Sequence, residues 1–365
     1  MKTHIVSVVG CCLVLFSNAG CDTTIHEYPE LKKSLVILEL HADRMPPTFY
    51  KEVVFDFDGN RSETLLEPDV AAVYLPDERL CLHFVTELYS VPSAESDICE
   101  GHLLERRVLS ADRLKEAPQD TLHFHVPTGL YRVLGWVDYA PVDSCKDWHF
   151  DTGVLTAVEA DVEHKPRNNH HKSSTAGRSH FAVDLYTDEK GYPVYLPEDT
   201  SAQETSTPNR LIPVYMKRPS ARFRLLATDL QEFQEGGNDT TGLNVRIVYK
   251  QYVSAGYNVD TQTPNQFVQT RTMDTSPSGQ AGDGTVLLAY DYVLTSDNEE
   301  DHVLIDIFIT DREGNEINAF QNISVPLRRN QETIVKGPFL TKEIDVSEIG
   351  IDDTFEDEHI IVIPD

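Results

Sequence analysis

Apolar and polar residues alternate over many short segments of this chain, and this period of two predicts β-strands. Two series of such segments occur, separated by turn residues such as Gly, Asp and Asn. The first series comprises residues 34–41, 50–57, 70–75, 79–88, 122–126 and 130–139. The second comprises residues 211–216, 221–228, 244–252, 286–295, 302–310, 323–327, 333–336 and 360–363. Strands at a spacing of about 8–12 residues predict an all-β protein built from β-sandwiches.

Three short segments predict how neighbouring strands connect. Residues 58–60 (Asp-Gly-Asn) and 311–315 (Asp-Arg-Glu-Gly-Asn) have the composition of hairpin turns, in which Gly adopts a positive φ. Residues 127–129 (Pro-Thr-Gly) predict a third turn, around which the last two strands of the first series would pair. Helical periodicity is nearly absent, and residues 103–114 are the one stretch that indicates a short helix.

The strand at residues 130–139 carries bulky apolar side chains on both faces. Tyr131 and Val133 fall on one face, while Leu134 and Trp136 fall on the other, because successive side chains of a strand alternate. This pattern predicts an interior strand of a sandwich. A buried Trp136 argues against a sugar-binding platform built from the two Trp residues of the chain.

Length and local composition predict two domains. The chain has 365 residues, which is long for a single sandwich. Residues 158–180 have no regular period and are expected to form an exposed loop, and residues 197–208 read as a loop or part of an interdomain linker. We therefore expect an N-terminal β-sandwich domain over residues 34–205 and a C-terminal one over residues 206–365.

The N-terminus has the composition of an export signal that ends just before Cys21. Residues 1–4 include one Lys, residues 5–16 are nearly all apolar, and small residues precede Cys21. The apolar run is shorter than the roughly 20 residues that span a bilayer as a helix. Residues 19–21 (Ala-Gly-Cys) also resemble the bacterial lipobox, in which the thiol is acylated before cleavage. The expected outcome is a cleaved signal peptide over residues 1–20, a tether over 21–33 and, as that resemblance implies, a lipid on Cys21. Plain signal cleavage with an ordinary Cys21 is the alternative.

Net charge limits the partners that this chain can bind. Residues 1–20 hold one Lys and no acid, so the mature chain has 30 basic and 60 acidic residues and a net charge of −30. Such a surface repels nucleic acid and anionic lipid headgroups. We expect no nucleic-acid partner and a position out in the solvent.

Cysteine and histidine spacing gives little support to a metal site. Cys81, Cys99 and Cys145 remain in the mature body without a Cys-x-x-Cys spacing, and their disulfide state is open. The His-rich stretch between residues 164 and 180 places no Cys or carboxylate at ligand spacing. Residues 56–60 resemble half of a calcium loop but lack the closing Glu, so a hairpin turn is expected. We predict no metal and no cofactor.

Motifs for nucleophilic, zinc-dependent and phosphate-binding catalysis are absent from the sequence. We therefore expect no catalytic residues and no enzymatic activity. Three functions stay open: an adhesive surface protein, a surface lipoprotein that binds glycans for nutrient uptake, and, as the weakest, a secreted hydrolase.

Several segments together resemble the Bacteroidales fimbrial anchor lipoproteins of the FimB/Mfa2 type and related two-domain fimbrillin-like proteins. Besides the export signal ending at Cys21, they are residues 129–139, 216–230, 256–259, 335–341 and 355–364. The resemblance covers almost the whole mature chain. It implies two tandem transthyretin-like β-sandwich domains, held to the outer membrane by acylated Cys21 and exposed at the cell surface.

The same resemblance implies partners and a processing state. Fimbrial or other surface subunits would bind through β-strand addition, in which one chain supplies a strand to another's sheet. Stalk subunits of such fibres lose an N-terminal strand by cleavage after a basic residue, whereas an anchor would keep it. We therefore expect Arg44, which lies between the first two predicted strands, to stay uncut.

Overall fold

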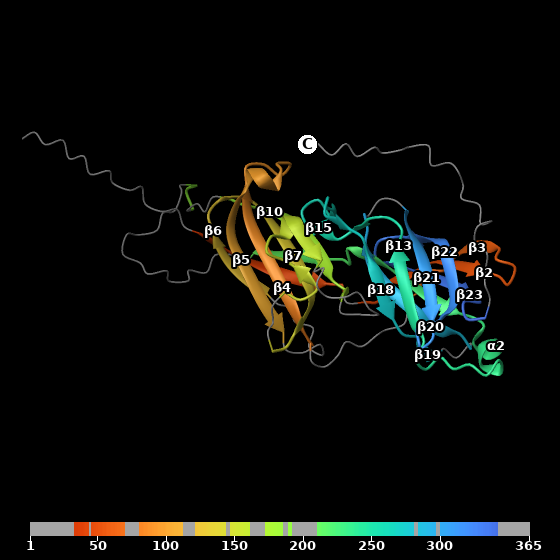
Figure 1. Ribbon diagram of the computed structural model, residues 1–365. Helices are drawn as coiled ribbons and strands as arrows, with labels where there is room; N and C mark the ends of the chain where they lie inside the picture. The colour runs from red at the N-terminus through yellow and green to blue at the C-terminus, as the bar shows by residue number, and fades with distance from the viewer. Residues whose placement is uncertain are drawn as a thin grey trace, which may run out of the picture.

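The computed structural model is an all-β protein whose strands pack as layered sheets (Figure 1). It describes residues 33–43, 45–69, 80–111, 121–143, 147–160, 172–184, 189–191, 210–280, 284–296 and 300–341. Strands pair mainly with partners far away in sequence, and apolar side chains that alternate along them face shared cores.

Two sheets form what we call the first sandwich. One has the order β11-β1-β6, with β1 (Ser34–Ala42), β6 (Thr121–Val126) and β11 (Arg210–Met216). The other has the order β10-β7-β4-β5, with β4 (Leu80–Val91), β5 (His102–Ala111), β7 (Gly129–Pro141) and β10 (Thr175–Val183). Side chains such as Leu38, Phe124 and Val133 fill the space between the two sheets.

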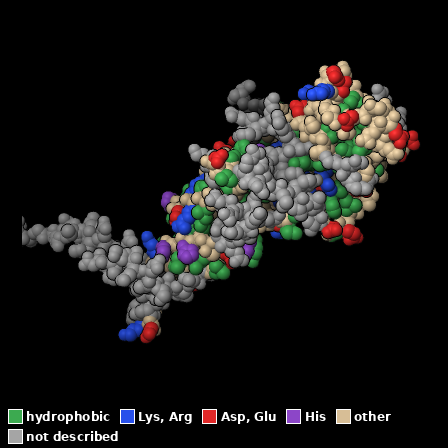
Figure 2. All heavy atoms as spheres, turned by 90° about the horizontal axis from the view of Figure 1, so that it is seen from below, with side chains coloured by type: hydrophobic (Ala, Val, Ile, Leu, Met, Phe, Trp, Pro, Cys, Tyr) green, Lys and Arg blue, Asp and Glu red, His purple; other side chains and the backbone are tan. Residues whose placement is uncertain are grey.

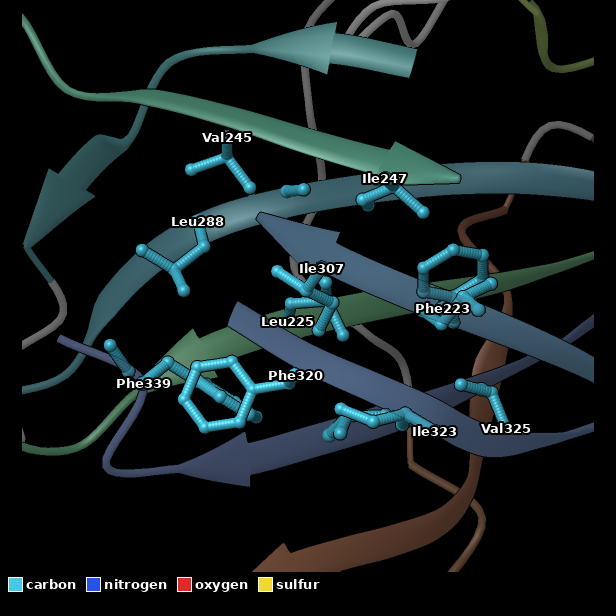
Figure 3. Packing of buried hydrophobic residues seen from close by; sticks show 14 of the residues in the cluster. Phe223, Leu225, Val245, Ile247, Leu288, Ile307, Phe320, Ile323, Val325 and Phe339 are labelled. Atoms are coloured by element: carbon cyan, nitrogen blue, oxygen red, sulfur yellow. The ribbon is translucent and has the colours of Figure 1, made fainter. Parts of the chain in front are cut away.

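Two further sheets form the second sandwich. One has the order β19-β20-β12-β23-β2-β3, with β2 (Thr48–Phe55), β3 (Arg61–Leu65), β12 (Ser220–Ala227), β19 (Ser278–Gln280), β20 (Val286–Leu294) and β23 (Gln331–Gly337). The other has the order β18-β13-β21-β22, with β13 (Asn244–Tyr249), β18 (Thr272–Thr275), β21 (Asp301–Thr310) and β22 (Glu316–Leu327). Phe223, Ile307 and Phe320 lie in its core (Figure 3).

A small third layer covers the outer face of β7. Its sheet has the order β16-β15-β9-β8, with β8 (Phe150–Asp151), β9 (Val158–Ala160), β15 (Gly256–Asn258) and β16 (Thr263–Pro264). Tyr257 of β15 packs with Trp136, and both are 0% exposed. Because β9 and β15 come from distant parts of the chain, this layer fastens the two sandwiches together.

The remaining elements are short. They are the pair β14 (Val253–Ser254) and β17 (Val268–Gln269), the helix α2 (Leu230–Glu235), and the 3-10 turns η1 (Ile98–Glu100) and η2 (Leu155–Ala157).

Two stretches of chain run from one sandwich into the other in the same direction. β1 lies in the first sandwich and β2 in the second, and β11 and β12 repeat this arrangement. These pairings cross the domain boundary predicted between residues 205 and 206. A cut there does not separate the sandwiches, because β2, with β3 beside it, pairs with the later strand β23, while β11 pairs with β1.

Most predicted strands are confirmed, and so are the hairpin turns at residues 58–60 and 311–315. Gly59 and Gly314 have φ angles of 85° and 87°, and the carboxylates of Asp56 and Asp311 accept hydrogen bonds from the backbone of Asn60 and Asn315. Residues 56–60, which resemble half of a calcium loop, thus form a turn in which the Asp56 carboxylate accepts a hydrogen bond from the backbone of Asn60. Trp136 is a core residue, as predicted.

The predicted helix at residues 103–114 is wrong. Residues 102–111 form the edge strand β5, which pairs with β4 from Leu82↔Ala111 to Ser90↔His102. Pairing with a long buried neighbour overrides the local helical preference of Leu, Glu and Arg.

The predicted pairing of residues 122–126 with 130–139 is also wrong. β6 pairs with β1, whereas β7 lies between β4 and β10 in the facing sheet. The connection at residues 127–129 therefore passes from one sheet to the other. Only one face of β6 is buried, whereas both faces of β7 are. β6 therefore suits a sheet with one face open to solvent, and β7 suits a sheet that is covered on both faces.

The loop predicted over residues 158–180 is wrong at both ends, because residues 158–160 form β9 and residues 175–183 form β10. Residues 161–171, with three of the four His of that stretch, lie outside the described residues. So do the segments 70–79, 192–209 and 342–365, which include two predicted strands and the predicted linker.

Candidate functional site: the first strand and its junction

The predicted lipidation residue, Cys21, lies outside the described residues, as do Arg44 and Cys145. The first described residue is Lys33, one residue before β1. β1 is consequently the first described element that a tether from Cys21 would reach, and its environment forms the candidate site.

β1 is a central strand with a partner on each side. It pairs in parallel with β11 from Val36↔Arg210 to Ala42↔Met216, and antiparallel with β6 from Ser34↔Val126 to Glu39↔Thr121. Val36 and Leu38 are 0% exposed and face the core of the first sandwich. Burial of two such side chains contributes roughly 3–6 kcal/mol, so β1 is an integral part of the core.

The link between β1 and β2 is held by backbone and side-chain hydrogen bonds. The backbone N–H of Asp43 donates to the carbonyl of Met216 at 2.9 Å, and Asn330 Nδ2 donates to the Asp43 carboxylate at 3.4 Å. These contacts join the link to the β11–β12 and β22–β23 connections.

Arg218 is the centre of this junction. Its side chain donates to the carbonyl of Met45 at 2.8 Å, to Asn330 Oδ1 at 2.6 Å and to Ser173 Oγ at 3.2 Å. Its own carbonyl accepts from Arg329 Nε at 3.0 Å. One buried guanidinium thereby fixes three segments that are distant in sequence.

A buried ion pair joins the first sandwich to the segment that follows β15. Arg132 Nη1 lies 3.0 Å from Asp260 Oδ2, and both side chains are almost fully buried. Arg132 also donates to the carbonyls of Ala94 and Ser96, and Arg178 donates to the Asp260 carbonyl. The Arg132 side chain is thus held by one carboxylate and two backbone carbonyls.

A second buried cluster surrounds Asp291 of β20. Its carboxylate accepts from Lys172 Nζ and Arg271 Nη2, each at 3.1 Å, and from the Tyr249 hydroxyl at 2.9 Å. Burial and the charge of Arg271 lower the pKa of Lys172 to about 8, although Asp291 opposes the shift. The cluster ties the segment before β10 to the second sandwich.

The third polar cluster is an imidazole–carboxylate pair. His83 Nδ1 lies 3.0 Å from Asp138 Oδ1, with exposures of 3% and 2% for the two residues, and Asp147 approaches the same nitrogen at 3.8 Å. Burial lowers the pKa of His83, but the hydrogen bond and charge of Asp138 outweigh it, so the net shift is upward. A pair so far from solvent is out of reach of a dissolved substrate and acts on stability.

The sheet edges differ in how strongly they are blocked. An isolated bridge between Ala176 and Lys217 closes the β10–β11 edge, and Gly177 there leaves no room for a Cβ beside the carbonyl of Tyr215. On the opposite side, the Arg107 guanidinium lies 4.1 Å from the Phe124 ring centroid and covers the core between β5 and β6. Inward-pointing charges of this kind discourage strand addition.

The β3 edge is one of the exposed sheet edges in the described part of the chain. Ser62 to Leu65 are all exposed, Leu65 at 71%, and β3 pairs only with β2. Arg61 Nη2 donates to the carbonyl of Ser324 at 3.2 Å, which ties one end of β3 to β22.

Within the described residues, no three His, Cys, Asp or Glu side chains are grouped to hold a metal ion. None of the described helices has the length and apolar character needed to cross a membrane. Cys81 Sγ donates to the carbonyl of Ala140 and Cys99 is exposed, so these two thiols are not joined as a disulfide.

On the face shown in Figure 2, acidic side chains lie toward both ends rather than in one patch. With 60 acids against 31 bases in the whole chain, this surface is unsuited to a nucleic-acid backbone.

Comparison with known proteins places the chain in a family. Residues 61–364 match the model of a family described as "Family of unknown function (DUF6562)". The chain belongs to the DUF6562 family. No curated protein matches it.

Solved structures of similar fold come from Bacteroides and Porphyromonas. A candidate adhesin from Bacteroides thetaiotaomicron is 13% identical, with 86% of this chain and 95% of that chain covered and a TM-score of 0.43. A candidate polysaccharide-binding protein (DUF1812) from the same species is 8% identical, with 79% and 80% covered and a TM-score of 0.42. The fimbrial anchor protein Mfa2 from Porphyromonas gingivalis is 11% identical, with 79% and 82% covered and a TM-score of 0.37.

Fimbrial and adhesin proteins are among the similar solved structures, at low identity, while the matching family model is this DUF6562 family. The place of this chain as a particular fimbrial subunit stays a proposal.

Sequence reasoning missed the polar residues that fix the junction, above all Arg132, Arg218 and Asp260. One signal was present: Arg132 and Asp138 stand among apolar residues in a strand with two buried faces. A charge at such a position requires a partner, although the sequence does not say which residue supplies it.

Arg132→Ala should destabilise the protein by about 3 kcal/mol, because the buried Asp260 carboxylate loses its nearest cation and keeps only Arg178, whose Nη1 lies 3.6 Å away. Arg246→Ala is the matched control, since Arg246 pairs with Asp274 on the surface and its loss should change stability by less than about 1 kcal/mol. Urea denaturation of both variants measures the two values. Equal effects would contradict the assigned role of Arg132.

The His83–Asp138 pair should make stability depend on pH. Because the folded pKa of His83 is raised above its ordinary value of about 6.5, its contribution is complete below that pH and is lost as pH rises through the folded pKa. His83→Asn should therefore lose more stability at pH 6 than at pH 9. Denaturant midpoints at both pH values test this, with exposed His123→Asn as the control expected to show no such difference.

Proposed function

We propose that this protein is a lipid-anchored cell-surface protein of the outer membrane and serves as an anchor or minor subunit of a fimbria or related adhesive assembly. The observation that carries the proposal is the joining of an export-type segment ending at Cys21 to a first strand built into the middle of a sheet. Such a protein works by holding on to other molecules and not by catalysis.

The short tether keeps the body close to the membrane. Residues 22–33 number twelve, and a fully extended chain spans at most about 3.6 Å per residue, so the first sandwich begins within roughly 40 Å of the acylated thiol. The net negative charge repels anionic headgroups, so the lipid and not the protein surface supplies membrane affinity.

Keeping β1 suits an anchor. Cleavage after Arg44 would sever β1 from β2, leaving the tether joined to the body only through sheet pairing and packing. We propose that Arg44 stays uncut in the mature protein, so that the covalent chain from Cys21 into β2 remains whole.

Subunit contact is assigned to strand addition at a sheet edge. β3 is the edge proposed, because its outer residues are exposed and it lies at the end of the molecule opposite β5 and β6 (Figure 1). Main-chain hydrogen bonds would supply affinity, and exposed Leu65 would contribute apolar contact.

A surface glycan-binding lipoprotein is the alternative, and one observation favours it. Tyr215 is 66% exposed on the outer face of the first sandwich, where its ring stacks with His41 at 4.9 Å. Affinity gels with soluble polysaccharides distinguish the two functions, since a Tyr215-dependent retardation would support glycan binding.

Cys21→Ala tests the tether directly. The variant should leave the membrane fraction, because loss of the acyl chains removes about 0.8 kcal/mol per buried methylene. Cys99→Ala, at an exposed thiol of the body, is the matched control and should stay membrane-bound.

Two measurements test the proposal. Fractionation of cells by centrifugation shows whether each variant stays with the membrane, and mass spectrometry of the mature protein identifies its N-terminal residue and any acyl groups on it. A mature mass that begins at acylated Cys21 and includes Arg44 supports the proposal. Membrane retention of the Cys21→Ala variant, or a mature chain that begins after Arg44, would refute it.

A further inference from the structure

The position of β1 decides how a pull on the tether is resisted. This inference rests on the proposed function in one respect: tension from a membrane-held Cys21 enters the described fold at Lys33 and Ser34. The first element to carry that tension is β1, and every later element receives it through the contacts of β1 or through the link to β2.

The direction of β1 is set by its register. β1 starts where β6 ends, at the pair Ser34↔Val126, and residues 127–129 then lead into β7, whose first residues pair with Val91. The loop at residues 92–101 therefore lies at the same end of the sandwich as the start of β1. From there β1 runs toward the second sandwich.

A pull on the tether along this direction loads the pairing of β1 in shear. Hydrogen bonds of a sheet run across the strands and not along them, so sliding β1 out strains all the bonds to β11 and β6 together. Peeling would instead break them one after another. Shear therefore requires a larger force.

Side-chain packing opposes the same movement. Val36, Leu38 and Leu40 point into the core, and a shift by one residue would turn all three toward the opposite face. A displacement of two residues is the smallest that returns these side chains to the core face, because the side-chain period of a strand is two residues.

The link to β2 places a second pairing in series with the first. β2 lies parallel to β23, with Thr48↔Gln331 at its start and Val54↔Lys336 near its end. The hydrogen bonds of Asp43 and Arg218 hold the link between the two strands in place. A pull that displaced β1 would also have to drag β2 along β23.

We propose that β1 is a shear clamp: a tether-borne strand whose two-sided pairing, continued through β2, resists extraction when the protein is pulled from its N-terminus. The clamp is a mechanical property of the fold and does not require that the pulling partner be known. Its resistance depends on direction, which sets it apart from general stability.

Single-molecule pulling of the full mature chain in two directions tests the clamp. In the shear geometry the handles are Cys21 and an E313C thiol on the exposed β21–β22 turn, with Cys99→Ser. In the peeling geometry they are Cys21 and the native, exposed Cys99, at the same end of the first sandwich as the start of β1. Both chains carry Cys145→Ser and are prepared without lipid.

The first rupture force should be about twofold or more higher in the shear geometry at the same loading rate, because the bonds of β1 then share the load. Equal forces, or a higher force on peeling, would overturn the clamp. Since no lipid is involved, this outcome is independent of the membrane-release test, and the clamp and the tether can fail separately.

A pair of matched variants separates the clamp from thermodynamic stability. Val36 of β1 and Val133 of β7 are both 0% exposed and belong to the same core. Val36→Ala and Val133→Ala should lower the denaturation midpoint to similar degrees, yet only Val36→Ala should markedly lower the first rupture force in the shear geometry. Equal losses of force in the two variants would count against the proposal.

Discussion

The pairing of β1 with a strand on each side is the constraint on which the rest of the structure depends. β11 and β6 flank β1, so the N-terminal strand completes one sheet of the first sandwich and cannot leave without exposing its core. The same stretch of chain continues into β2 and enters the second sandwich. One stretch of chain thus supplies a strand to each half of the molecule.

Polar residues make this arrangement specific. The two sandwiches could contact one another through apolar surface alone, but Arg132, Arg218 and Asp291 each join segments that are far apart in sequence. Buried charges tolerate few alternative geometries because each loses its solvation and needs its partner. The layer formed by β9 and β15 adds backbone pairing to the same junction.

The alternating pattern was enough to predict an all-β fold and most strand positions. Apolar residues such as Val36, Leu38 and Val133 show within a single strand which of its faces is buried. Pairing partners were not predictable in this way. β5 was expected to be helical and β6 to pair with β7, since the strands that decide both outcomes are distant in sequence. The ion pairs of the junction were missed for the same reason, and Cys21 stays a prediction from the export pattern alone.

Hydrogen exchange under native conditions tests most directly whether β1 is integral to the fold. We predict that the bonded amides of residues 34–42 exchange as slowly as those of 129–141, through global unfolding, while those of the exposed edge strand 61–65 exchange sooner. Exchange of residues 34–42 well before residues 129–141 would mean that β1 detaches on its own, and would contradict its integral role.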